Sequence, residues 1–359
     1  MNLNRMKPPV KACAVLLLVV CIWRIFGAPV SKTDLQKIGM QAWQARILLP
    51  QRVERMLVYW MGYPVAEEDE ETFSSHSYEQ DAKISVYLTQ ENRLVQMSFE
   101  GYVCGVVAAE MPAQYHMEAL KAQAVAARTR LLRQMKDGGC SLHPDADICT
   151  DSSHCQGYAT LAQCREKWGE SYEIYCDRIV RAQRETQREW IAYGGEPITV
   201  LYHAISGGRT ENVQSVFSQE LPYLVSVHSE GEERVRGYQE ETLYTFNEIA
   251  KVLNQSLDME LTAEELRRTF AISGYTESGR VQSVQIGNRQ IDGTLLRNAL
   301  GLRSTWFSIS MDHQGILFHQ RGYGHGVGMS QAGANSMAAA GADYKQIIQH
   351  YYTGVYIVQ

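Results

Sequence analysis

The chain has 359 residues, of which 45% are hydrophobic and 21% are charged, and its formal net charge is -6. This is an ordinary globular composition, and the length suits one large domain or two moderate ones. A net negative chain without a long basic stretch is not expected to bind nucleic acid.

The amino-terminal segment predicts a membrane anchor. Three basic residues precede an apolar run at 12–23, which is the pattern of a signal peptide or a signal anchor. The run is shorter than the roughly 20 residues of a full span, but Arg24 can snorkel and extend it to residue 30. Because no Ala-x-Ala cleavage site follows closely, we expect an uncleaved anchor over residues 1–30, with its amino terminus inside. A buried core helix is the alternative.

Residues 31–82 predict a membrane-proximal stalk and a linker. Apolar residues recur with helical spacing over 31–62, and five acidic residues follow at 67–71. Such a run of like charge is most simply a solvated linker. A calcium site is the alternative, although five adjacent acids lack the spacing of a coordinating loop.

From Lys83 onwards short alternating and apolar segments predict a mixed fold. Alternating residues at 83–88 and 94–99 flank a polar turn and predict a β-hairpin. We expect helices at about 101–110, 115–136, 171–188, 247–254, 262–269, 292–300, 330–340 and 344–352. We expect a second hairpin from strands at 190–193 and 199–203, and further strands near 280–291 and 304–319. Because no strand–helix–strand rhythm recurs, the fold class is α+β, with mixed helices and antiparallel hairpins forming one curved domain with a cleft over 83–359.

One carboxylate lies within an apolar run, Val103-Cys-Gly-Val-Val-Ala-Ala-Glu110-Met-Pro112. Such surroundings remove solvation from a carboxyl group, favour its neutral form and raise its pKa. A carboxyl group that stays neutral near pH 7 is the proton donor that general acid catalysis needs. The alternative is that Glu110 ends a helix and faces water or pairs with Lys121 or Arg128.

A second cluster of reactive side chains predicts a metal site. The chain has eight cysteines, too few for a disulfide framework to hold a fold of this length together. Within thirteen positions, however, lie His143, Cys149, His154 and Cys155, a set that zinc accepts tetrahedrally. A Cys149–Cys155 disulfide and a polar loop with nothing bound are the alternatives. Four protein ligands would leave no position for water, so the site would be structural.

Two glycine-rich segments predict ligand recognition. In Arg321-Gly-Tyr-Gly-His-Gly-Val-Gly-Met-Ser-Gln-Ala-Gly333, alternating glycines let the backbone approach a ligand closely. The segment lacks the Lys and Ser/Thr of a nucleotide loop, and His325 and Gln331 suit a polar neutral ligand such as a sugar. A tight turn with a packed histidine is the alternative. In the second segment, Tyr202-His-Ala-Ile-Ser-Gly-Gly-Arg-Thr210, Ser206 does not lie in the Gly-x-Ser-x-Gly elbow of a serine hydrolase. We expect instead a turn whose serine and backbone N–H groups point into a cleft.

Together these motifs resemble the stage II sporulation protein D family, the sporulation-specific peptidoglycan lytic transglycosylases of endospore formers. The resemblance extends from about Lys83 to the carboxy terminus. The segments that carry it are Gly105-Val-Val-Ala-Ala-Glu-Met-Pro112, Ala119-Leu-Lys-Ala-Gln-Ala-Val-Ala-Ala-Arg-Thr129, Cys155-Gln-Gly-Tyr158, Ser206-Gly-Gly208 and Gly322-Tyr-Gly-His-Gly-Val-Gly-Met-Ser-Gln-Ala-Gly333.

The resemblance implies roles for individual residues. It places the family's catalytic glutamate at Glu110 and conserved basic and aromatic positions at Lys121, Arg128 and Tyr223. With the residues of the glycine-rich segments, the predicted substrate-binding set is Lys121, Arg128, Ser206, Tyr223, His325 and Gln331. A solvated helix face is the alternative for Lys121 and Arg128. Because some clostridial members hold zinc with two Cys and two His, the resemblance also implies a structural zinc ion at His143, Cys149, His154 and Cys155.

The reaction that the resemblance implies is cleavage of MurNAc–GlcNAc bonds in peptide-stripped glycan strands, with 1,6-anhydromuramyl products and no cofactor in the chemistry. One carboxylate suffices for it, whereas ordinary glycosidases use two. The implied setting is the cytoplasmic membrane, crossed once, with the catalytic domain between mother cell and forespore during engulfment. The implied partners are stage II sporulation proteins P and M. A non-catalytic wall-binding or amidase-enhancing protein and a zinc amidase or peptidase are the alternatives.

Overall fold

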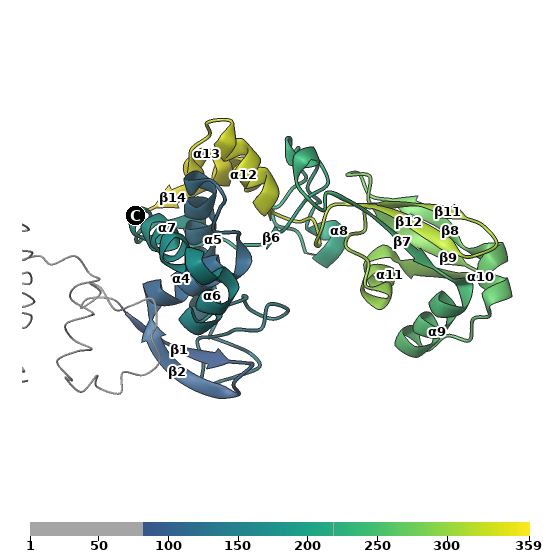
Figure 1. The fold of residues 1–359 in the computed structure, drawn as a ribbon, viewed down its shortest axis with the longest axis horizontal. Helices are drawn as coiled ribbons and strands as arrows, with labels where there is room; N and C mark the ends of the chain where they lie inside the picture. Colours follow the sequence, from purple (N-terminus) through teal and green to yellow (C-terminus); the bar gives the residue numbers. More distant parts are fainter. Residues whose placement is uncertain (1–81, 218) are drawn as a thin grey trace, which may run out of the picture. The chain divides into compact units, whose positions relative to one another are not determined.

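The computed structural model describes residues 82–217 and 219–359 (Figure 1). The predicted anchor over 1–30 and the predicted stalk and linker, apart from residue 82, lie outside the described residues. Among the residues that are described, no helix combines the length and the apolar character needed to cross a bilayer.

Helix α4 (Phe99–Glu110) carries the candidate acid at its last residue. The helix begins where the side chain of Ser98 accepts a hydrogen bond from the backbone N–H of Gly101. It ends because the residue before Pro112 is pushed out of the helical region, and Met111 has an extended backbone. All residues of α4 except the last two are buried, so the helix lies inside the core.

Helix α5 (Met117–Lys136) is the centre of the first core. It contacts four other helices, namely α4, α7 (Tyr172–Glu185), α12 (Gln331–Ala339) and α13 (Tyr344–Tyr351). The alanines of α5 favour the helix and let its neighbours approach closely. Figure 1 shows the yellow carboxy-terminal helices α12 and α13 beside the blue α5, although they are about 200 residues apart in sequence.

Three small sheets and two short helices complete this part of the chain. The first sheet has the order β2–β1–β3, with β1 (Lys83–Leu88), β2 (Arg93–Ser98) and β3 (Ile148–Cys149). The second has the order β14–β4–β5, with β4 (Trp190–Tyr193), β5 (Glu196–Pro197) and β14 (Tyr356–Val358). The third pairs β6 (Tyr202–His203) in parallel with β13 (Met329–Ser330). The short helices are α6 (Leu161–Trp168) and α8 (Gln214–Phe217).

A second hydrophobic core forms between residues 244 and 318. One of its sheets has the order β11–β12–β7, with β7 (Gln239–Tyr244), β11 (Phe307–Met311) and β12 (Ile316–Arg321). The other has the order β10–β9–β8, with β8 (Ala271–Tyr275), β9 (Val281–Ile286) and β10 (Arg289–Asp292). The helices of this core are α9 (Phe246–Leu257), α10 (Ala263–Thr269) and α11 (Gly293–Leu300).

The predicted α+β class is confirmed as a mixture of helices with several small sheets, whereas the curved shape and the cleft stay predictions. The first hairpin pairs Lys83 with Ser98, as its alternation predicted. The second hairpin is wrong in part, because residues 199–203 do not pair with β4. Instead Tyr202 pairs with Met329, a partner that no local pattern could reveal. Helix α6 was not predicted.

Candidate functional site

The carboxyl group of Glu110 is half-buried at the end of α4. Its Oε1 accepts a hydrogen bond of 2.9 Å from the backbone N–H of Gly157. Burial raises the pKa of Glu110 above its usual value, because desolvation penalises the carboxylate. The Gly157 bond and the charge of Arg130 oppose this rise without cancelling it. The surroundings of Glu110 therefore favour its neutral form more than water does, while the Gly157 N–H and Arg130 stabilise the carboxylate.

The groups around Glu110 come from segments that are far apart in the sequence. Besides Gly157, the hydroxyl of Tyr202 and the amide of Gln331 are neighbours that lower the pKa of the Glu110 carboxyl group. The pairing of β6 with β13 brings these two residues to the same place, because Gln331 follows β13 directly. The Tyr202 hydroxyl donates its hydrogen bond to Oε1 of Gln156 over 3.1 Å. None of these neighbours is a second carboxylate.

Glycine is required at two positions where residues 155–158 dock on α4. A Cβ on Gly157 would lie 2.8 Å from Oε1 of Glu110, closer than carbon and oxygen atoms approach. A Cβ on Gly105 would lie 2.0 Å from the ring of Tyr158. The missing side chains therefore let this segment reach the helix and place its N–H on the candidate acid.

The candidate metal centre consists of three cysteines and one histidine: Cys140, Cys149, His154 and Cys155. The three sulfurs lie 3.7, 3.5 and 3.2 Å from Nδ1 of His154, and the sulfurs of Cys140 and Cys155 are 4.0 Å apart. With zinc–sulfur bonds of about 2.3 Å and zinc–nitrogen bonds of about 2.0 Å, a tetrahedral site places its ligand atoms roughly 3.5–3.8 Å apart. The four side chains therefore fit a zinc ion, and all three cysteines are free rather than disulfide-bonded.

The surroundings of the cluster also suit a metal ion. Nε2 of His154 lies 3.0 Å from Oγ of Ser141, the kind of outer contact that fixes the orientation of a metal-binding histidine. Burial raises the pKa of the Cys149 and Cys155 thiols, so their thiolate forms need a nearby positive charge. Four protein ligands leave no open position, so a bound ion would be structural. It would stabilise the loop that continues directly into Gly157.

The predicted ligand His143 is wrong, and Cys140 takes its place. The imidazole of His143 stacks on the ring of Tyr87 in β1, with centroids 3.6 Å apart. The cause is a turn in which the N–H of His143 bonds the carbonyl of Cys140. This turn directs His143 toward the sheet, while Cys140 remains beside Cys155. The spacing of Cys140 from the other ligands carried no recognisable signal in the sequence.

Two of the predicted substrate-binding residues form ion pairs. Nζ of Lys121 lies 2.7 Å from carboxylate oxygens of both Glu118 and Glu185. Arg128 is only 1% exposed, and its guanidinium donates two hydrogen bonds of 2.8 and 2.7 Å to Glu100. Arg128 thus joins α5 to α4 and does not lie on a surface that a glycan can reach, so neither a glycan contact nor a solvated face describes it.

The remaining predicted substrate-binding residues differ in their surroundings. Tyr223 is buried and accepts a hydrogen bond from the N–H of Thr199. His325 is half-buried, and burial together with the charges of Arg297 and Arg280 lowers its pKa to about 4, so it is neutral at pH 7. Gln331 is the member of the set that acts on Glu110, whose pKa it lowers, and its amide donates to Gln123 over 3.4 Å.

Sequence reasoning missed Glu232, a fully buried carboxylate. It accepts hydrogen bonds from the backbone N–H groups of residues 206–208 and from the hydroxyls of Ser206, Ser229 and Ser330. Ser330 is also the N-cap of α12. The Ser206 turn that we expected to face a cleft is therefore satisfied internally. Through Glu232 it is tied to the helix that presents Gln331.

Comparison with known proteins adds an independent observation. The profile of a family described as "Stage II sporulation protein" (SpoIID) matches residues 87–193, which include Glu110 and the metal cluster. The chain is 35% identical over 274 residues to stage II sporulation protein D of Bacillus subtilis strain 168, which covers 76% of this chain and 78% of that protein. It is 33% identical to the Bacillus amyloliquefaciens protein of the same name, covering 77% and 79%. The chain is also 25% identical to the amidase enhancer of Bacillus subtilis strain 168. That alignment covers 70% of this chain and 39% of the amidase enhancer.

Proposed function

Because the chain belongs to the stage II sporulation protein D (SpoIID) family, we propose that it is a peptidoglycan lytic transglycosylase that acts in sporulation. The observation that carries the proposal is the environment of Glu110. Its carboxyl group has a raised pKa, a hydrogen bond from the Gly157 N–H, and a phenol and an amide as neighbours. A single carboxyl group of this kind can act in turn as acid and as base.

In the proposed reaction, neutral Glu110 gives its proton to the oxygen between N-acetylmuramic acid and N-acetylglucosamine as the bond from that oxygen to C1 breaks. The resulting carboxylate takes the proton of the muramyl C6 hydroxyl, whose oxygen forms a new bond to C1. The product is a 1,6-anhydro ring, Glu110 regains its proton, and no water is consumed. One carboxyl group therefore completes the cycle without the second acid of ordinary glycosidases.

The neighbours of Glu110 have opposite effects on the two halves of this cycle. Burial favours the neutral acid that starts the reaction. The hydrogen bond from Gly157, the polar groups of Tyr202 and Gln331, and the charge of Arg130 favour the carboxylate that completes it. This balance lets the same carboxyl group give a proton and take one back.

The substrate, location and partners are part of the same proposal. By analogy with the family, the enzyme acts on strands already stripped of stem peptides, so it works after stage II sporulation protein P and on the scaffold of stage II sporulation protein M. The basic and apolar amino-terminal sequence supports a signal anchor that holds the domain outside the cytoplasmic membrane. A structural zinc ion at the Cys140 cluster supports the loop that presents Gly157.

The decisive experiment compares the wild-type protein with Glu110→Gln on peptide-free glycan strands. The amide keeps the size of the side chain but cannot donate the proton, so cleavage should fall about 10²–10⁴-fold. Mass spectrometry of the products measures the anhydromuramyl ends. Glu166→Gln, at an exposed glutamate of α6, is the matched control and should keep full activity. Undiminished anhydromuramyl release by Glu110→Gln would refute the assignment.

The similarity to an amidase enhancer supports a second candidate, a non-catalytic wall-binding protein that stimulates an amidase. This candidate predicts that the purified protein releases no anhydromuramyl products and that Glu110→Gln stimulates an added amidase as well as the wild type does. The glycan digestion described above therefore separates the two functions.

A further inference from the structure

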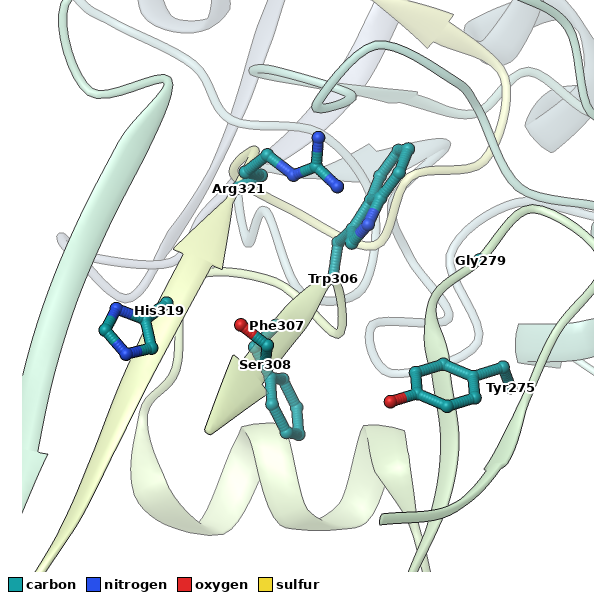
Figure 2. Close-up of a pocket in the computed structure, with 7 residues that line it drawn as sticks. All are labelled: Tyr275, Gly279, Trp306, Phe307, Ser308, His319 and Arg321. Carbon is teal, nitrogen blue, oxygen red and sulfur yellow. The ribbon is translucent and has the colours of Figure 1, made fainter. Parts of the chain in front are cut away.

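A pocket of about 170 Å³ lies on the second core, lined by Trp306 and Arg321 together with Tyr275 and His319. Figure 2 shows the guanidinium of Arg321 beside the indole of Trp306, with the hydroxyl of Tyr275 across the pocket. The Cζ of Arg321 lies 4.6 Å from the ring centroid of Trp306, a cation–π contact. The N–H of Arg321 also bonds the carbonyl of Trp306 over 2.9 Å, so the two residues form a preorganised pair.

Arg321 is exposed and has no ion pair with any carboxylate that the structure describes. It also lines a second pocket, of about 580 Å³, together with Glu233 and Tyr238. Part of its guanidinium acts on the Tyr238 hydroxyl, where it opposes the rise in the pKa of that group, and the fork has further donors for a ligand. Because a guanidinium presents a planar fork of donors that matches a carboxylate, this position favours an anionic ligand.

A second positive charge is buried beside the same indole. Arg280 is 1% exposed, and its Cζ lies 5.4 Å from the Trp306 centroid. One of its nitrogens donates to the carbonyl of Ser206, whereas Nε and Nη1 have no partner among the described residues. Burial lowers the pKa of Arg280 to about 10, so it stays charged at neutral pH. A buried donor without a protein partner is costly unless a water molecule, an ion or a ligand satisfies it.

The acidic groups near Arg280 are already occupied. Glu211 and Glu232 are the carboxylates whose charges act on Arg280. Glu211 accepts hydrogen bonds from the hydroxyls of Thr276 and Ser278, and Glu232 accepts those of the Ser206 turn. Neither forms an ion pair with a guanidinium among the described residues. The indole therefore lies beside two arginines that both lack a directly paired carboxylate.

From these observations we propose that the Trp306–Arg321 pocket is a glycan subsite that binds the carboxylate-bearing sugar of a peptide-free strand. This inference rests on the proposed function and deepens it. The lactyl group of N-acetylmuramic acid ends in a free carboxylate once its stem peptide is removed, whereas a peptide-bearing lactyl group is a neutral amide. Arg321 receives the carboxylate, and the aromatic faces of Trp306 and Tyr275 cover the apolar side of the sugar ring.

The subsite is joined to the surroundings of Glu110 through the backbone. A Cβ on Gly207 would lie 3.1 Å from the ring of Trp306 and 3.4 Å from Cβ of Arg321, so the turn held by Glu232 packs directly behind the pair. Ten residue steps lead from Arg321 to Gln331, a neighbour of Glu110, so this connection spans at most about 35 Å.

The test measures binding by calorimetry with the full-length protein that carries Glu110→Gln, so that strands are not consumed. One probe is a peptide-free strand of alternating GlcNAc and MurNAc with free lactyl carboxylates, and the other is the same strand with these groups as methyl amides. In this background, Arg321→Gln should weaken binding of the acidic strand about tenfold, or about 1.4 kcal/mol. It should leave binding of the amide strand unchanged. Arg289→Gln, at an exposed arginine of β10, controls for the change in net charge.

Two further variants keep the test sharp if Arg321→Gln disturbs folding. Arg321→Lys keeps the charge but loses the bidentate fork, so its affinity for the acidic strand should lie between that of the protein with Arg321 and that of Arg321→Gln. Trp306→Ala should weaken binding of both strands. Equal effects of Arg321→Gln on the two strands, or none, would overturn the subsite even if the wild type cleaves glycan. Charge-selective binding by a wild type that cleaves nothing would instead refute the catalytic proposal and retain the subsite.

Discussion

The backbone N–H of Gly157 donates its hydrogen bond to Oε1 of Glu110, and Gly157 lies two residues after the last cysteine of the metal cluster. The loop that the Cys140 cluster organises is therefore the loop that holds the candidate acid. Folding of this loop and the geometry of Glu110 are coupled through a contact of 2.9 Å. A substitution in the metal cluster should therefore change the environment of Glu110, and a substitution at Glu110 should change the stability of the loop.

Gly157→Ala should reduce cleavage while leaving most of the folding stability. The added Cβ would lie 2.8 Å from Oε1 of Glu110, so the carboxyl group has to move and the N–H bond is lost. A displacement of about 1 Å at a reacting group can lower the rate roughly 10²-fold. Steady-state cleavage of peptide-free strands and thermal unfolding measure the two effects. Full activity would show that this contact does not position the acid.

Tyr202→Phe should move the alkaline limb of the pH–rate profile to higher pH. The reaction needs neutral Glu110, so the rate falls as pH rises through the Glu110 pKa. The Tyr202 hydroxyl is a polar neighbour that lowers that pKa, and its removal therefore raises the pKa further. The profile of kcat/KM measures the limb, and Tyr356→Phe, at an exposed tyrosine, is the control. An unmoved limb would exclude Glu110 as the group that titrates there.

Glu110→Gln should stabilise the fold at alkaline pH relative to the wild type. The folded-state pKa of Glu110 is raised above its unfolded value, so the wild type loses stability as pH rises through the folded pKa. Below the unfolded pKa both states are protonated, and the difference between the proteins should be constant. Urea unfolding at pH 4 and pH 8 measures this trend. A difference that does not grow with pH would contradict the desolvation of this group.

Cys140→Ser should remove the bound metal, whereas His143→Ala should retain it. Cys140 lies within the cluster of four ligand atoms, but His143 stacks on Tyr87. Metal content by mass spectrometry and the melting temperature with and without chelator measure the outcome. Loss of metal from His143→Ala with retention in Cys140→Ser would reverse the assignment.

Glu232→Gln should destabilise the fold and disturb the candidate site together. The carboxylate accepts bonds from the residue 206–208 turn and from the cap of α12, and an amide nitrogen cannot accept them. Loss of one hydrogen bond to a charged group costs about 1.5–3 kcal/mol. Glu233→Gln, next to it and exposed, should stay within about 0.5 kcal/mol of the wild type. Chemical unfolding and kcat measure both, and equal stability of the two variants would contradict the role of Glu232.

Local elements of the fold could be predicted because their causes are local. The hairpin of β1 and β2 follows from alternation across a polar turn, and the end of α4 follows from Pro112. The pairing of β6 with β13 could not be predicted in this way. Two strands of two residues each, more than 120 residues apart, leave no periodic signal and are stabilised only by the packing around them.

The sequence by itself determined the chemical groups and the family: an acid in an apolar helix, a set of thiols and imidazoles, and two glycine-rich segments. Only the tertiary structure decided which of these groups meet. It placed Cys140 rather than His143 in the metal cluster, buried Arg128 against Glu100, and set Glu232 behind the glycine turns. The physical reason is that ligation, ion pairing and desolvation depend on distances of a few ångströms. Such distances between remote residues are set by packing and not by their spacing along the chain.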